Sequence, residues 1–187
     1  FEVEATTDKA TPVNIIHHSY WNLSGDHETS INDHLLQINA DHFLPTDAGL
    51  IPTGEKATVE GTPMDFRTPT AIGAGVDADF EPLKLAGGYD HCWVLRGEGL
   101  RSVVKVTDPK SGRSMELVTD QAGVQFYGGN FLDGKTEGKN GIMYPYRSAL
   151  CLETECFPDS PNQPSFPNCI LKPGDTYRHT LIHRFSW

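Results

Sequence analysis

Glycine and proline recur along the whole chain and leave little room for a long helix. The 187 residues include 18 glycines and 13 prolines. No apolar period of 3.6 residues continues for more than two turns, so no helix is predicted. Short segments of alternating or β-branched residues recur between the turn residues instead. This pattern is typical of sandwiches and barrels of antiparallel strands, so the chain is predicted to be all-β.

Eight segments carry the strand pattern. They span residues 1–7, 13–21, 35–43, 102–107, 115–119, 123–127, 149–157 and 177–187. The segments 102–107 and 115–119 flank a turn-forming sequence and are expected to pair as a hairpin. The last segment alternates well, with Tyr177, His179 and Leu181 on one face of the expected strand.

Length and charge exclude several classes of protein. A chain of this length fits one domain, so residues 1–187 are expected to form a single β-sandwich domain. Lys and Arg number 15 against 25 Asp and Glu, which gives a net charge of −10, and no basic cluster occurs. Neither nucleic acid nor an anionic membrane is therefore expected as a partner. The chain also lacks the run of about 18 apolar residues that a membrane-spanning helix needs.

The cysteine content bears on the compartment. Four cysteines are too few for a scaffold built on disulfides; they are Cys92, Cys151, Cys156 and Cys169. Their sparse use favours reduced thiols and a cytoplasmic location. Secretion stays open, because a targeting segment would lie upstream of Phe1.

The histidines do not form a metal motif. His179 and His183 have the spacing that a helix uses for zinc, but on a strand they lie roughly 13 Å apart. One ion cannot bridge that distance with bonds of about 2 Å. His17 and His18 are neighbours and would point to opposite faces of a strand. No metal and no cofactor is therefore expected, and phosphate-binding loops and the GxSxG nucleophile motif are also missing from the sequence.

Three residues are candidates for chemistry, and two of them, Glu153 and His18, lie in predicted strands. Glu153 follows Leu150 and Leu152 in a largely apolar segment, where shielding from water would raise its pKa and make it a usable base. An exposed glutamate on the outer face of the sheet is the alternative. His18 can equally be a hydrogen-bonded structural histidine, and Asp90 can be a residue that stabilises a turn.

Six motifs in the chain follow the order found in one known family. They are NIIHHSYWNL (14–23), FLPTD (43–47), GTPMDFR (61–67), GYDH (88–91), GVQFY (123–127) and LETECFPD (152–159). Together they make the chain similar to the aldose 1-epimerases, the galactose mutarotases, from about Phe1 to Trp187. One short motif would be a weak signal, but six in the right order are specific.

The resemblance implies an antiparallel β-sandwich of the galactose-mutarotase type and a small aldose as the substrate. It also implies interconversion of the α and β anomers of galactose or glucose through the open-chain aldehyde, without a cofactor. Carried over to this sequence, Glu153 would be the base and His18 the acid, while Asp90 and Gln125 would hold sugar hydroxyls. His17 stays outside this site. Ring opening needs an acid and a base acting on two oxygens of one carbon, which agrees with these residue types.

The chain departs from the family at its beginning. Family members are much longer, and their upstream half supplies an arginine and a histidine to the same pocket. The N-terminal part of the domain is therefore expected to be missing, and the isolated chain to be poorly stable. Three alternatives stay open: a non-catalytic sugar-binding or regulatory protein, a hexose-6-phosphate 1-epimerase, and a structural β-sandwich that inherited the motifs. The preferred aldose and the oligomeric state are open as well.

Overall fold

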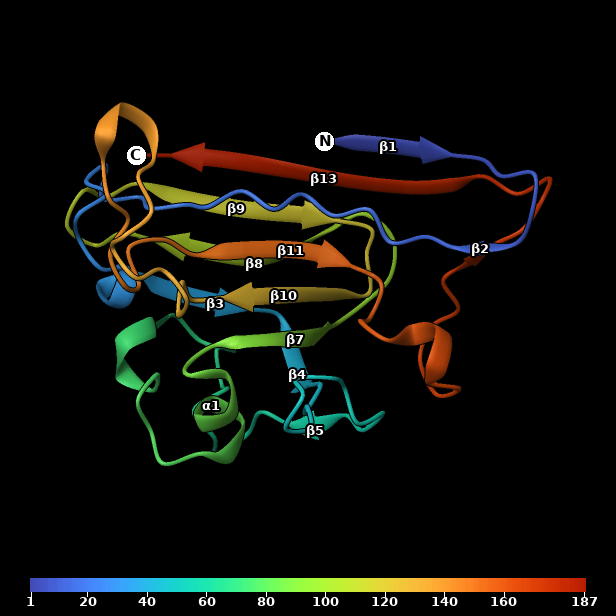
Figure 1. The fold of residues 1–187 in the computed structure, drawn as a ribbon, viewed down its shortest axis with the longest axis horizontal. Helices are drawn as coiled ribbons and strands as arrows, with labels where there is room; N and C mark the ends of the chain where they lie inside the picture. Colours follow the sequence, from blue (N-terminus) through green and yellow to red (C-terminus); the bar gives the residue numbers. More distant parts are fainter.

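The computed structural model describes all 187 residues, and antiparallel strands dominate its secondary structure (Figure 1). The strands are β1 (Glu2–Ala5), β2 (Thr11–Pro12), β3 (Leu35–Ile38), β4 (Ala40–Phe43), β5 (Ala57–Thr58), β6 (Thr70–Ala71), β7 (Asp90–Leu95), β8 (Arg101–Thr107), β9 (Ser114–Thr119), β10 (Gly123–Tyr127), β11 (Cys151–Glu155), β12 (Ile170–Leu171) and β13 (Tyr177–Ser186). Every pairing between them is antiparallel. The all-β prediction is confirmed.

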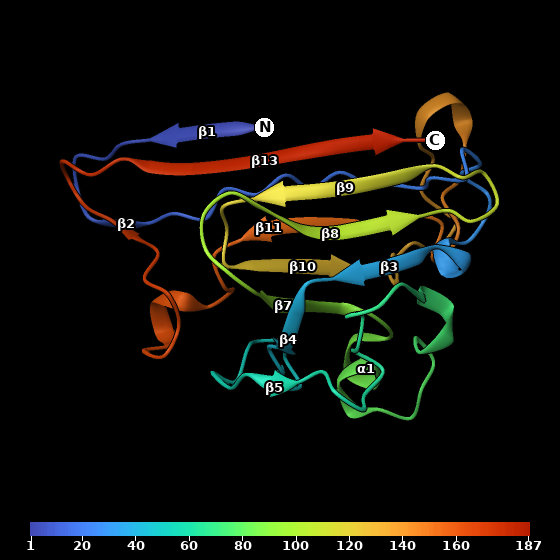
Figure 2. The same ribbon diagram turned by 180° about the vertical axis from the view of Figure 1, so that it is seen from behind.

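Two sheets packed face to face form the body of the fold. The larger sheet has the strand order β1-β13-β9-β8-β3-β6, and the smaller has the order β11-β10-β7-β4-β5. Strand β8 lies behind β11 in Figure 1 and in front of it in Figure 2, so the sheets form two layers. A core of 25 buried residues joins them, with Leu117 and Leu181 from the larger sheet and Trp93 and Phe126 from the smaller. The predicted sandwich is therefore confirmed.

Several strands lie where the sequence pattern predicts them. Strands β8 and β9 form the expected hairpin, and β10 has the expected bounds. The long last strand, β13, lies between β1 and β9. The alternation in β13 directs His179 and Leu181 into the buried side of the sheet, where side chains leave water.

Residues 35–43 form two strands instead of the one predicted. Strand β3 belongs to the six-stranded sheet and β4 to the five-stranded sheet. Asn39 lies between them, where its N–H donates to the Val103 carbonyl and its own carbonyl accepts from the N–H of Arg96. The chain changes sheets at this point because its two neighbours, β8 and the end of β7, belong to different layers.

The prediction of a strand over residues 13–21 is wrong. The segment is extended, but only Trp21 makes a ladder contact, an antiparallel bridge to Leu150. The N–H of Ile15 donates to the Tyr177 hydroxyl, and its carbonyl is 2.8 Å from the His179 ring nitrogen Nδ1. These partners lie on β13 of the six-stranded sheet, whereas the Asn14 side chain bonds to Glu155 on β11 of the five-stranded sheet. The segment therefore bonds to both layers, and it runs alongside β11 (Figure 1).

The prediction that no helix forms is also wrong for one short segment. The helix α1 spans Glu81–Ala86, with a proline in its first turn and Gly87 closing it in the left-handed region at φ 66°. Six residues are too few for an apolar period to be visible in the sequence. Single 3₁₀ turns lie at Ile31–Asp33, Ile72–Ala74, Lys139–Gly141 and Ser160–Asn162. None of these helical segments has the length and apolar character that crossing a bilayer requires.

Candidate functional site

The outer face of the five-stranded sheet carries three of the four predicted site residues. Gln125 on β10 lies opposite Glu153 on β11, and Tyr127 on β10 lies opposite Asp90 on β7. Side chains two residues apart on a strand share a face, so Asp90, Gln125 and Glu153 all point away from the core. The intervening residues of these strands, such as Phe126, pack into the core instead.

His18 reaches the same place from the extended segment beside β11. Its Nε2 atom lies 3.2 Å from the Glu153 carboxylate oxygen Oε1. The histidine side chain is 46% exposed and the glutamate side chain 8% exposed. The pair is therefore open to solvent on the histidine side and enclosed on the glutamate side.

Tyr20 holds one side of the His18 ring. The two rings stack with their centroids 5.4 Å apart and an angle of 25° between their planes. The Tyr20 ring also meets the edge of Tyr127. His17 points the other way, toward the rings of Phe1 and His183. The alternation predicted for the two neighbouring histidines is confirmed, although the segment is not a strand.

The electrostatic surroundings of Glu153 suit a base. Burial raises the pKa of its carboxyl, the charge of Asp90 raises it further, and His18 lowers it. The alternative of an exposed Glu153 is wrong, since only 6% of the residue is accessible to solvent. A carboxylate with a raised pKa holds a proton more readily than an ordinary one, as general-base work near neutral pH requires.

Asp90 and Gln125 form the second pair of the site. The Gln125 Nε2 atom donates a hydrogen bond of 2.8 Å to the Asp90 Oδ1 atom. Burial raises the pKa of the Asp90 carboxyl, while this hydrogen bond and the charge of His18 lower it. Asp90 begins β7, and its carboxylate accepts from Gln125 on the neighbouring strand. The alternative of a turn-stabilising Asp90 does not describe these contacts.

Two residues of the site were assigned no role from the sequence, Asn14 and Glu155. The Asn14 side chain donates to the Glu155 oxygen Oε2 and to the Cys156 carbonyl, each at 3.2 Å, and accepts from the Cys156 N–H at 3.1 Å. The strand pattern did place Glu155 on the same face as Glu153. Burial, followed by the charge of Glu153, raises the pKa of the Glu155 carboxyl to about 8, so this side chain holds its proton at neutral pH.

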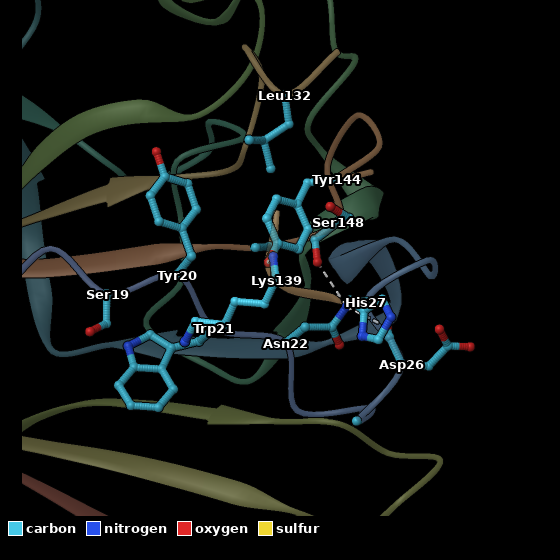
Figure 3. A pocket seen from close by; sticks show the side chains of 12 residues that line it. Ser19, Tyr20, Trp21, Asn22, Asp26, His27, Leu132, Lys139, Tyr144 and Ser148 are labelled. Carbon is cyan, nitrogen blue, oxygen red and sulfur yellow. Dashed lines mark hydrogen bonds between the residues drawn. The ribbon is translucent and has the colours of Figure 1, made fainter. Parts of the chain in front are cut away.

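A cavity of about 620 Å³ adjoins the site. Figure 3 shows Tyr20, Leu132 and Tyr144 around it, with the Asn22 side chain donating a hydrogen bond to the Ser148 carbonyl. Tyr20 belongs to both places, because its ring stacks on His18 and lines the cavity. None of the four predicted site residues lines this cavity. His18 and Glu153 lie beside it, on the face of the sheet.

The arrangement can serve a small polar molecule. An acid and a base 3.2 Å apart reach two oxygens bound to one carbon without a large movement of either side chain. The amide and carboxylate of Gln125 and Asp90 supply donors and acceptors on the same face.

The chain is similar to known proteins over nearly its whole length. The family model described as Aldose 1-epimerase matches residues 1–184. The galactose mutarotase of Homo sapiens is 48% identical over 183 residues, which cover 97% of this chain and 52% of that protein. The aldose 1-epimerase of Escherichia coli (strain K12) is 38% identical over 185 residues, 97% of this chain and 53% of that protein.

Solved structures show the same fold. An aldose epimerase homologue from C. elegans superimposes with a TM-score of 0.84 at 29% identity, covering 99% of this chain and 55% of that one. The galactose 1-epimerase from Lactobacillus acidophilus also gives a TM-score of 0.84, at 28% identity, covering 99% of this chain and 52% of that one. The chain thus spans about half the length of these relatives. Since the family match covers nearly every residue, the chain belongs to the aldose 1-epimerase family.

Proposed function

We propose that this protein is a mutarotase that interconverts the α and β anomers of galactose or glucose. The observation that carries the proposal is the 3.2 Å separation between Glu153 Oε1 and His18 Nε2. Glu153 takes the proton of the C1 hydroxyl while His18 gives a proton to the ring oxygen. The C1–O5 bond breaks and the open-chain aldehyde forms. Rotation about the C1–C2 bond and closure on the other face follow, with both proton transfers reversed.

Asp90 and Gln125 are proposed to hold the sugar through its hydroxyl groups. A hydroxyl both donates and accepts, and this pair offers a carboxylate acceptor and an amide with both functions. Their mutual hydrogen bond of 2.8 Å supports a role in binding, because it orients both groups on the outer face of the sheet. A small aldose is the only partner in this proposal, and the reaction needs no cofactor.

The proposal includes a further segment that completes the sugar pocket. It is supported by the length of the relatives, of which the chain covers about half. Exposed apolar side chains at the C-terminal end, Phe185 and Trp187, also favour a packing partner. Residues 1–187 would then be the C-terminal part of a larger domain. This portion alone would be poorly stable and have a low melting temperature. A cooperative thermal transition with a melting temperature well above that of ordinary domains would contradict that expectation.

The sparse cysteines support a cytoplasmic location.

Polarimetry tests the activity directly. The optical rotation of fresh α-D-galactose and α-D-glucose would be followed in buffer, with the protein, and with its Glu153→Gln variant. The Glu98→Gln variant is the matched control, because Glu98 is an exposed residue outside the site. We expect the protein to accelerate the change in rotation, Glu153→Gln to lose on the order of 10²–10⁴-fold, and Glu98→Gln to behave as the unaltered protein.

The intact mass shows whether the sample contains residues 1–187 alone or the full-length protein with the further segment. A negative result with residues 1–187 alone would mean an incomplete site. A full-length sample that binds galactose in a calorimetric titration without accelerating its mutarotation would overturn the enzyme and favour a sugar-binding protein. Acceleration with hexose 6-phosphates alone would move the activity to the phosphorylated sugars. Acceleration that survives Glu153→Gln would overturn the assignment of the base.

A further inference from the structure

Cys151 lies at the acid–base pair but has no part in the proposed reaction. It is two residues before Glu153 on β11 and therefore shares the outer face of the sheet. The residue is buried, and its thiol is unpaired. The Cys151 sulfur, a His18 ring nitrogen and a Glu153 carboxylate oxygen all lie within 4.8 Å of one another.

We propose that His18, Cys151 and Glu153 form a binding site for a thiophilic divalent cation, of which Zn²⁺ is the reference, and that the bound ion blocks the acid–base pair. Imidazole nitrogen, thiolate sulfur and carboxylate oxygen are the three kinds of ligand that zinc takes from proteins. The site is a place of inhibition and not a catalytic centre, because the proposed ring opening uses the same two side chains free of metal.

The distances suit a tetrahedral ion. Zinc bonds of about 2.0–2.3 Å place neighbouring ligand atoms about 3.3–3.6 Å apart. The His18–Glu153 separation of 3.2 Å is close to that range. The Cys151 sulfur lies within 4.8 Å of each of the other two atoms, so closing either gap requires a movement of about 1.5 Å at most. The half-exposed His18 side chain can move toward the sulfur, and a small rotation of the Glu153 or Cys151 side chain closes the other gap. The open side of His18 leaves the fourth position to water.

The donor set and the local charge select the ion. A thiolate beside an imidazole favours zinc, whereas magnesium and calcium prefer oxygen ligands alone. Asp90 adds a carboxylate near enough to raise the pKa of Glu153, so the field at the site favours a cation. On binding, the Cys151 thiol gives its proton to solvent and a sulfur–metal bond forms.

Cobalt spectroscopy tests the site without reference to activity. The chelator-treated protein would be titrated with Co²⁺, whose bond to a thiolate gives an absorption band in the near ultraviolet. We expect one equivalent to bind with this band, and excess Zn²⁺ to remove it. Cys151→Ser and His18→Gln should each weaken binding by at least tenfold. Substituting even a residue that only hydrogen-bonds to a metal ligand typically lowers metal affinity 10- to 100-fold. Circular dichroism would show that each variant is folded.

Cys156→Ser is the matched control, because Cys156 is also unpaired but belongs to another place, beside Ser160. Its band should equal that of the unaltered protein. A protein without the thiolate band, or a band that survives Cys151→Ser, or one that Cys156→Ser removes, would overturn the site.

The inhibition rests on the proposed function and has its own readout. Polarimetry would compare the rate with micromolar Zn²⁺ and the rate with EDTA, separately for the unaltered protein and the Cys151→Ser variant. We expect Zn²⁺ to lower the rate of the unaltered protein at least tenfold and to change the variant's rate much less. Equal sensitivity would overturn the inhibition. A cobalt band in a protein without mutarotase activity would uphold the metal site while the proposed function fails.

Discussion

Asn14 and Glu155 are joined by a hydrogen bond of 3.2 Å from the asparagine Nδ2 to the carboxyl oxygen Oε2. The same asparagine side chain bonds to both backbone groups of Cys156. Asn14 precedes His18 on the extended segment, and Glu155 follows Glu153 on β11. The contact therefore ties the carrier of the proposed acid to the carrier of the proposed base.

Replacing Asn14 by alanine should loosen this tie. We expect kcat/KM for galactose to fall by about tenfold to a hundredfold, because small misplacements of catalytic groups cost that much. The stability should fall as well, by about 2–3 kcal/mol, since the Asn14 side chain makes three hydrogen bonds that contribute about 1 kcal/mol each. Polarimetry and thermal melts would measure both. Asn162→Ala, in an exposed turn away from the pair, is the control, and an unchanged rate in Asn14→Ala would contradict the tie.

Tyr20 should act through its ring and not through its hydroxyl. Tyr20→Phe keeps the stacking on His18 and should retain most of the activity, whereas Tyr20→Ala frees the half-exposed His18 ring and should lower kcat. Steady-state polarimetry on the two variants separates the roles. Equal losses in both would show that the hydroxyl, rather than the ring, is what matters.

Asp90→Asn should change both binding and pH dependence. Loss of a charged hydrogen-bonding partner should lower kcat/KM by about 10- to 100-fold. The charge of Asp90 raises the pKa of Glu153, so removing it lets Glu153 lose its proton at lower pH. The acid side of the kcat/KM profile should therefore move to lower pH. A profile that moves upward or stays in place would show that another group controls this limb.

Glu155→Gln should stabilise the protein, and more so at higher pH. The pKa of Glu155 rises from an ordinary 4.5 to about 8 in the folded protein. Between these values the folded state holds a proton that the unfolded state has lost, so the stability of the unaltered protein falls as pH rises. Glutamine keeps an oxygen for Asn14 and does not titrate.

Urea unfolding at pH 5 and pH 8 would measure this effect. We expect the advantage of Glu155→Gln to grow between the two values by an amount on the order of a few kcal/mol. The exposed Glu98→Gln change should show no such growth. A constant difference for Glu155→Gln would mean that the carboxyl does not titrate in this range.

Local patterns were sufficient for much of the sheet structure. The hairpin of β8 and β9 and the strand β10 follow from alternation and turn chemistry, both of which act over a few residues. The strand predicted over residues 35–43 divides at Asn39 because its partners lie in two layers, which no local signal reveals. The helix α1 was missed because six residues are shorter than two turns.

The candidate site was likewise predictable only in part. The six motifs singled out His18, Asp90, Gln125 and Glu153, and alternation placed Glu153 and Glu155 on one face. Neither could show that His18 comes within 3.2 Å of Glu153, because the segment that carries it is held by Asn14 and Tyr177 and not by a strand ladder.

The amino-acid sequence by itself determined the all-β class, the family and the residue types available for acid–base chemistry, because these depend on composition, short-range alternation and motif order. The tertiary structure alone decided which side chains meet, how deeply Glu153 and Glu155 are buried and in which direction their pKa values move. Burial and charge act through space between segments far apart in the chain, so they exist only once the two layers and the edge segment have packed together.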